Sequence, residues 1–263
     1  MRLNKTHMPD PRIVTTFILV VVFLGSLLFS DWGNLVSHGG GGAMIRLMGK
    51  GLISLELSYD FILLALEASL ITLAYAVCAI SVAVSFGFIG GLIASGGLFS
   101  SIVTKLSAIV FFRALLAVVR SIHELIWAWL IALALGFTPM SGILALAVPY
   151  SAILARVYAD FLNDVPEPSL QALRTSGATP LQVMLYGRIS AAAKEMVSYG
   201  FYRFECCIRS ASVLSFIGLQ GLGYQIGVSL DDLLFAEVWT LLLFLVGLII
   251  LVDYWGSTLR RFL

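Results

Sequence analysis

Long apolar runs constrain the fold of this chain more than any other feature of its sequence. Several of these runs reach or approach the roughly 20 residues that a helix needs to cross the hydrocarbon core of a bilayer. Of the 263 residues, 60% are hydrophobic and only 12% are charged, about half the charge that is usual in a soluble domain. A single soluble domain of this size has too little interior to bury so many apolar segments. The sequence therefore predicts an all-α membrane protein, a polytopic helical bundle.

About six transmembrane helices are predicted from these runs. They cover residues 13–29, 61–94, about 106–136, about 142–160, about 196–217 and 233–252. The first run follows a basic N-terminal stretch and no A-x-A cleavage site comes after it, so a retained signal-anchor helix is predicted. The third run contains Arg113 and Arg120. It is therefore either one span or an interfacial helix followed by a shorter span.

An even number of spans places both chain ends on the same side of the membrane. Both ends are basic, which predicts that both termini are cytoplasmic. Residues 31–60 then lie outside, and the glycines at 39–42 predict a flexible loop there. Residues 164–195 lie inside. The predicted organisation is thus an N-terminal anchor helix with an external loop (1–60) and a transmembrane domain (61–263) that carries the internal segment 164–195.

The internal segment 164–195 contains a predicted helical hairpin. Pro168 and Ser169 suit the start of a helix, and Gly177 suits a helix end in the left-handed conformation. Pro180 prevents direct continuation, after which residues 181–189 can begin a second short helix. A transporter that couples to an outside energy source needs a rigid cytoplasmic element through which a partner protein can transmit its movement. The same pattern also fits an ordinary helical connection.

The hairpin resembles the "EAA" loop of ABC importer permeases, in which a short coupling helix docks into a groove on an ATPase subunit. The residues that carry this resemblance are Ala172, Leu173, Arg174, Gly177 and Ala178. The resemblance implies that these residues, together with Gln171, couple the chain to the ATPase. Gln171 stands where the motif usually has an acidic residue, and Ser190 stands where proline is common. Both departures bear on how the loop docks.

Three further stretches are similar to permeases of the phosphonate, phosphite and phosphate family. They are RSIHELIW at 120–127, GFTP at 136–139, and YRFE with RSA between 202 and 211. The likeness extends from about Phe61 to the C-terminus and implies the type I importer permease fold. It also implies a non-catalytic permease subunit, in the inner membrane, of an ATP-driven importer for a small phosphorus oxyanion.

The same resemblance implies a set of partners. They are two copies of an ABC ATPase, a periplasmic or lipid-anchored substrate-binding protein, and a second copy of this chain in a homodimer. ATP and Mg would be bound by the ATPase, because the chain has no G-x-x-x-x-G-K-[ST] loop. No cofactor is implied for the chain itself. The net charge of +1 provides no field that would attract nucleic acid.

Charged residues within the predicted spans need a partner or a function, because each costs about 2.5–3.5 kcal/mol at the centre of a membrane helix. Glu205 and Arg209 are four residues apart, in the order that favours an intrahelical ion pair. Arg120 and Glu124 have the same spacing. Arg203 lies off that face of its helix and has no local acidic partner.

Structural ion pairs and an anion pathway are both compatible with these residues. A planar guanidinium group matches the geometry of a phosphonate or phosphite oxyanion, so arginines that line a central cavity would attract an anion in transit. The predicted pathway residues are Arg203, Arg209, Arg120, Glu205, Tyr202 and His123. No catalytic or metal-binding residue is predicted.

Two other classes of membrane protein remain open. An ion-coupled secondary transporter of a small anion would use Glu205, His123 and Arg203 as a proton relay. Such transporters are commonly built from inverted repeats, and the sequence shows no convincing repeat. An intramembrane enzyme would need a paired nucleophile and base, or a motif such as H-E-x-x-H, and the dipeptide His123-Glu124 lacks the second histidine.

Overall fold

The computed structural model describes residues 11–29, 41–99 and 101–262. Every regular element in these ranges is a helix, which confirms the all-α prediction. Contacts divide the chain into two compact units, Met1–Gly49 and Lys50–Leu263. The functional division expected after residue 60 stays a prediction.

The first unit contains α1 (Pro11–Phe29) and the start of α3 (Gly41–Ile53). None of residues 12–29 is buried within this unit. The flexible loop predicted for residues 31–60 is wrong for residues 41–53, which are helical. Glycines are permissive rather than helix-breaking at a helix start, and the apolar residues that follow them favour the helix. Residues 30–40 of the predicted loop lie outside the described ranges.

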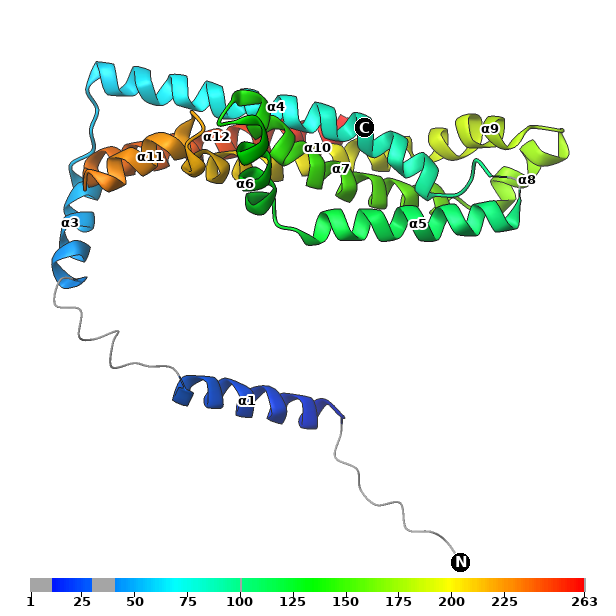
Figure 1. Cartoon of the computed structure of the whole chain (residues 1–263), viewed down its shortest axis with the longest axis horizontal. Coiled ribbons are helices and arrows are strands. Elements are labelled where there is room, and N and C mark those ends of the chain that lie inside the picture. The colour runs from blue at the N-terminus through cyan, green and yellow to red at the C-terminus, as the bar shows by residue number, and fades with distance from the viewer. Residues whose placement is uncertain (1–10, 30–40, 100, 263) are drawn as a thin grey trace, which may run out of the picture. The chain divides into compact units, whose positions relative to one another are not determined.

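The second unit is a bundle of long helices with shorter helices at its ends (Figure 1). Its elements in chain order are α4 (Tyr59–Ala94), α5 (Ile102–Ser121), α6 (Glu124–Leu135), α7 (Pro139–Asp164), α8 (Glu167–Thr175), α9 (Pro180–Gln182), the π-helix η1 (Val183–Ile189), α10 (Ser190–Leu214), the 3₁₀-helix η2 (Ser215–Ile217), α11 (Leu222–Asp231) and α12 (Phe235–Phe262).

Four helices among the described residues are long and apolar enough to cross a membrane: residues 12–29, 59–94, 139–164 and 235–261. The third predicted run consists of α5 and α6, which meet at an angle of 88° and could count together as a fifth span. The bend lies at Ile122 and His123, whose backbone is extended. The fifth predicted span corresponds to α10, which has 25 residues but carries three charges between 203 and 209. The total of six spans therefore stays a prediction.

Helices α4 and α7 form the core of the second unit and pack through small side chains. Small residues recur about every four positions on the buried face of α4, at Ala68, Thr72, Ala76, Ala79, Ala83, Gly87 and Gly91. A Cβ on Gly87 would lie 2.7 Å from the Cβ of Leu154, and one on Gly91 would lie 2.8 Å from the Cβ of Tyr158. This small-xxx-small pattern lets two membrane helices approach closely, so the α4–α7 contact depends on both glycines.

The N-terminal half of α4 packs against α11 and α12. The backbone N–H of Leu222 donates a hydrogen bond of 2.9 Å to the buried hydroxyl of Thr72. Gly221 has a φ of 143°, and a side chain there would clash with the Thr72 hydroxyl. A second apolar cluster forms around Leu222 and Leu241. These contacts fix the short helix α11 at the end of the bundle opposite α8 and α9 (Figure 1).

Candidate functional site

The predicted hairpin is formed by α8, the turn that follows it, α9 and η1. Helix α8 ends in the turn at Gly177, whose φ of 82° is left-handed, as the sequence predicted. The N–H of Gly177 donates to the carbonyl of Arg174, and the N–H of Ala178 donates to the carbonyl of Leu173. These bonds satisfy the last carbonyls of the helix. The turn therefore needs a residue that accepts a positive φ.

The second arm of the hairpin begins with a capping box at Thr179. The Thr179 hydroxyl accepts from the N–H of Gln182, and the Gln182 side chain accepts from the N–H of Thr179. The helix predicted for residues 181–189 is present, but residues 183–189 adopt π-helical geometry. Short π-helical segments are rare and occur frequently at functional sites.

Packing against η1 holds α8 in place. Leu170 is fully buried, and a Cβ on Gly187 would lie 2.8 Å from the Cδ2 of Leu170 and 3.0 Å from the Cδ1 of Leu173. Leu173 is therefore an inward-facing residue of the predicted coupling set. Of that set, Gln171, Ala172, Arg174 and Gly177 are exposed, and Ala178 is half-buried. The hairpin thus has one face anchored to the bundle and one face available to a partner.

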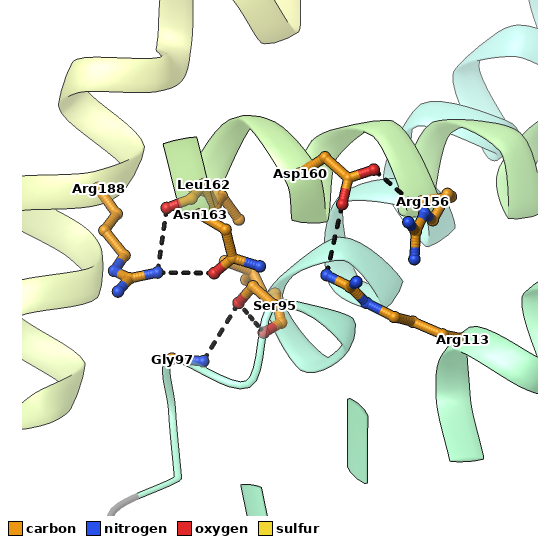
Figure 2. Close-up of polar contacts among 9 residues, drawn as sticks. Ser95, Gly97, Arg113, Arg156, Asp160, Leu162, Asn163 and Arg188 are labelled. Atoms are coloured by element: carbon orange, nitrogen blue, oxygen red, sulfur yellow. Dashed lines mark hydrogen bonds and ion pairs between the residues drawn. The ribbon is translucent and has the colours of Figure 1, made fainter. Parts of the chain in front are cut away.

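Arg188 in η1 ties the hairpin to the end of α7, a role that the sequence did not reveal. Its Nη1 donates to the carbonyl of Leu162 at 3.1 Å and to the Oδ1 of Asn163 at 2.9 Å (Figure 2). Burial lowers the pKa of Arg188. The contact caps the C-terminal carbonyls of α7 with a cation, which is favourable at that end of a helix.

A carboxylate on α7 joins this helix to α5. Asp160 forms an ion pair with Arg156 at 3.1 Å within α7 and with Arg113 of α5 at 3.4 Å. Figure 2 shows Asp160 between the two guanidinium groups. The Nε of Arg113 is buried and has no hydrogen-bond acceptor among the described residues. Two arginines share one carboxylate here, so the cluster keeps a net positive charge.

Arg203, the first of the predicted pathway residues, is held by aromatic side chains of α10. Its Nε and Nη2 both donate to the hydroxyl of Tyr199, at 2.8 and 2.6 Å. Its guanidinium carbon lies 5.1 Å from the ring centre of Tyr199 and 5.6 Å from that of Tyr202. Cation–π contacts of this kind stabilise a cation without neutralising its charge. No carboxylate contacts Arg203 in the described part of the chain.

The expected ion pair between Glu205 and Arg209 is wrong. Glu205 pairs with Arg260 of α12 at 2.6 Å, and the Glu205 side chain is only 12% exposed. Gly256 makes room for this pair, since a Cβ there would lie 2.7 Å from the Glu205 Oε1. Arg209 is exposed and its Nη2 donates to the Sγ of Cys206 at 3.6 Å. A partner 55 residues away in sequence outcompetes the one four residues away.

The expected pair between Arg120 and Glu124 is also wrong. The bend between α5 and α6 separates them, and the Nδ1 of His123 caps α6 by accepting from the N–H of Leu125 at 3.3 Å. Glu124 instead accepts a hydrogen bond of 2.7 Å from the Ser210 hydroxyl on α10. Arg120 is exposed. Arg203 and Arg209 donate to different acceptors, the hydroxyl of Tyr199 and the Sγ of Cys206, so no shared acceptor brings these two arginines together in the described ranges.

A polar network that the sequence did not indicate continues from Glu124 into the core. The hydroxyl of Ser210 lies 3.0 Å from that of Tyr150 on α7. Three helices, α6, α7 and α10, thereby meet at one hydrogen-bonded group of side chains. Arg209 and His123 are next in sequence to two members of this network. The only contact of a predicted pathway residue with this network in the described ranges is that of the His123 Nε2, which lies 3.9 Å from the Oε2 of Glu124.

A cavity of about 690 Å³ opens between α4, α10 and α12. Apolar side chains line it almost entirely, among them Ile80, Val84, Phe88, Met196, Phe204 and Trp255. None of the predicted arginines contributes to its wall. An oxyanion would lose its hydration there without gaining a counter-charge, so this cavity is not an anion site.

Comparison with known proteins identifies the kind of chain that has these features. Residues 87–262 match the family described as the binding-protein-dependent transport system inner membrane component. The phosphite transport system permease protein PtxC of Stutzerimonas stutzeri is 31% identical over 149 residues, which is 57% of this chain and 54% of that protein. The putative cryptic phosphonate transport system permease protein PhnE2 of Escherichia coli K12 is 25% identical over 45% of this chain and 97% of its own length. The chain spans about half the length of the phosphite-transport relatives that it matches.

Solved structures show the same fold. A chain of an amino acid ABC transporter, in a crystal structure with histidines, aligns with a TM-score of 0.65 and 20% identity over 80% of this chain and 100% of its own length. A chain of the MetNI methionine ABC transporter in an inward-facing conformation aligns with a TM-score of 0.68 and 20% identity, over 78% and 98%. The predicted type I importer permease fold is confirmed.

Proposed function

Because the chain belongs to the family of binding-protein-dependent transport system inner membrane components, we propose that it forms the membrane pathway of an ATP-driven importer for a small phosphorus oxyanion. The protein is a multi-pass permease subunit of the inner membrane. The observation that carries the coupling role is the hairpin, which has an exposed α8 face, an anchored Leu170 and a left-handed turn at Gly177. Such an element can transmit a conformational change of a partner protein to the helix bundle.

The proposed mechanism is alternating access by a homodimer, in which each copy supplies half of the pathway. Each hairpin would sit on one copy of a separate ATPase subunit, which binds ATP and Mg. Closure of the ATPases would move the hairpins and open the pathway to a loaded substrate-binding protein, and hydrolysis would reset the inward state. Both termini lie in the cytoplasm in this arrangement.

The substrate class is supported by the names of the relatives and by the charge on α10. The similar proteins are permeases for phosphite, phosphonate and phosphate. Arg203 carries a positive charge that aromatic groups hold in place without a carboxylate. A guanidinium group of this kind can exchange its phenol partner for an oxyanion, which is the stronger acceptor.

Reconstitution with the ATPase and the binding protein tests this function. Uptake and ATPase stimulation would be measured in proteoliposomes with phosphite, phosphonate and phosphate in turn. The Arg203→Gln variant is expected to lower uptake of the preferred anion by about tenfold or more, since a charge-assisted hydrogen bond contributes about 1.5–3 kcal/mol. The Lys194→Gln variant is the matched control, because Lys194 is exposed on the same helix.

Three results would contradict the proposal. Uptake that persists without the ATPase and collapses with the proton gradient would favour an ion-coupled secondary transporter instead. Stimulation by none of the three anions would refute the substrate class. Equal uptake by the Arg203→Gln and Lys194→Gln variants would remove Arg203 from the pathway.

A further inference from the structure

A second cavity, of about 340 Å³, lies at the hairpin end of the bundle. It is enclosed by the turn after α4, the start of α5, the end of α8, the hairpin turn and η1. Its lining residues are Gly96, Gly97, Phe99, Lys105, Arg174, Ala178, Pro180, Val183 and Arg188. Three of these side chains are cations and none is a carboxylate. The cavity is therefore positively charged, in contrast to the apolar cavity within the bundle.

The cations of this cavity keep donors that the described part of the protein does not use. Arg188 directs its Nη1 to Leu162 and Asn163, while its Nε and Nη2 have no acceptor among the described residues. Lys105 is exposed, and its ammonium group forms no ion pair in the same ranges. Only Arg174 has a counter-charge, from Glu167. Three cations and one carboxylate leave a surplus of positive charge.

Two glycines allow these cations to approach the turn after α4. A Cβ on Gly96 would lie 3.1 Å from the Cγ of Lys105, and Gly96 has a φ of 69°. A Cβ on Gly97 would clash with Met184 and would lie 3.6 Å from the Nη1 of Arg188. A side chain at Gly96 would first meet Ile109, and one at Gly97 would first meet Met184, so both glycines are needed for the close packing of this turn beside the cavity.

Like charges are brought together at this site. Burial lowers the pKa of Arg188, the nearby carboxylate of Glu167 raises it, and the charge of Arg174 lowers it by less than Glu167 raises it. Lys105 and Arg174 are exposed, so the cost of desolvation falls on the half-buried Arg188, and a bound anion would offset it. Room is sufficient, because a water molecule takes about 30 Å³ of liquid volume and a tetrahedral oxyanion takes only a few times more.

We propose that this cavity binds a tetrahedral phosphorus oxyanion through Lys105, Arg174 and Arg188. These residues belong to α5, α8 and η1, so one bound anion would bridge the hairpin to the bundle. Under the predicted topology the hairpin end faces the cytoplasm, where imported anion accumulates. The bound anion would stiffen the hairpin and slow the transport cycle. This regulatory consequence rests on the proposed import function, whereas the binding itself does not.

Calorimetric titration of inorganic phosphite tests the site directly. The assembled transporter would be used without nucleotide, in nanodiscs of zwitterionic lipid. Lys105→Gln and Arg188→Gln are each expected to weaken phosphite binding at this site by about tenfold, as loss of one charge-assisted contact requires. Lys194→Gln, which removes a charge outside the cavity, is expected to leave the affinity unchanged. Equal affinity in all three variants would overturn the proposal.

A second arm separates a free anion from a lipid headgroup. In nanodiscs that contain phosphatidylglycerol, weaker phosphite binding to the unmodified protein would assign the site to a headgroup phosphate. Unchanged binding would assign it to the free anion, and both results depend on the same cations. If Arg188→Gln fails to assemble because α7 loses its cap, Lys105→Gln decides the matter, since the Lys105 side chain holds no other described group.

The regulatory consequence has its own measurement. Phosphite on the hairpin side is expected to inhibit the stimulated ATPase of the unmodified transporter and to inhibit the Lys105→Gln variant at about tenfold higher concentration. Identical inhibition of both would overturn the regulatory role. A transporter that binds phosphite through Lys105 but imports no phosphorus oxyanion would retain the site and refute the proposed function.

Discussion

Replacing Gly177 with valine perturbs the hairpin turn with little direct effect on packing. The φ of Gly177 is 82°, in a region that costs an L-residue about 1–2 kcal/mol. A Cβ at this position would meet no atom within 4 Å, so crowding by the Cβ adds nothing and backbone strain accounts for the cost. A β-branched residue lies near the upper end, about 2 kcal/mol, which lowers the equilibrium constant between the native and non-native turn by about thirtyfold.

The loss is expected to appear in coupling rather than in assembly. Helix α8 has only nine residues, and isolated helices this short are unstable in water. It therefore depends on the turn and on Leu170 for its position. Gly177→Val is expected to insert and dimerise normally, and to lose most of the ATPase stimulation that the loaded binding protein gives. Size-exclusion chromatography and stimulated ATPase activity in proteoliposomes would measure the two properties.

Asparagine at the same position provides the matched control. Asparagine accepts the left-handed conformation far more readily than valine does, so Gly177→Asn is expected to retain most of the stimulation. Full stimulation in the valine variant would refute the coupling role of the turn. Equal loss in both variants would refute the argument from backbone strain, because the two residues would then act through some property other than φ.

Two further predictions concern the bundle. Gly87→Val is expected to destabilise the protein by about 1–3 kcal/mol through overpacking against α7. Gly247→Val is the control, because a Cβ there would meet no atom within 4 Å, and it is expected to leave the melting temperature in detergent unchanged. Equal melting temperatures of the two variants would contradict the packing argument. A double-mutant cycle between Glu205→Gln and Arg260→Gln is expected to give a coupling free energy of about 1–3 kcal/mol. The same cycle with Arg209→Gln in place of Arg260→Gln is expected to give no coupling free energy. A larger coupling to Arg209 than to Arg260 would instead support the intrahelical pair.

Features set by neighbouring residues were predictable from the sequence. The left-handed end of α8 follows from Gly177, and the second arm follows from Thr179 and Pro180, because caps and turns depend on contacts within a few residues. The membrane character follows from composition alone. The bend between α5 and α6 appeared only as an alternative, since an apolar pattern with Arg120 near its middle fits both one span and two shorter helices.

Features set by distant contacts were not predictable. The order Glu205–Arg209 favours an intrahelical pair, yet Arg260 takes the carboxylate because α12 packs against α10 and Gly256 leaves space. The role of Arg188 was equally hidden, since its acceptors lie on another helix. One sequence records which residues can pair, and only the packing decides which of them do.

The distribution of ion pairs bears on what the bundle can carry. Asp160 pairs with Arg113 of α5 and Glu205 pairs with Arg260 of α12, so each carboxylate joins its own helix to another one. Arg203 and Arg209, in contrast, have only a phenol and a thiol as described partners, and Arg188 keeps unused donors. A membrane-embedded guanidinium without a carboxylate is costly, and an anion in transit could supply the missing counter-charge for Arg203. Positive charge without a fixed counter-charge thus occurs on α10, at Arg203, and at the hairpin end, at Lys105 and Arg188, and these are the two places where the proposed anion contacts can be tested separately.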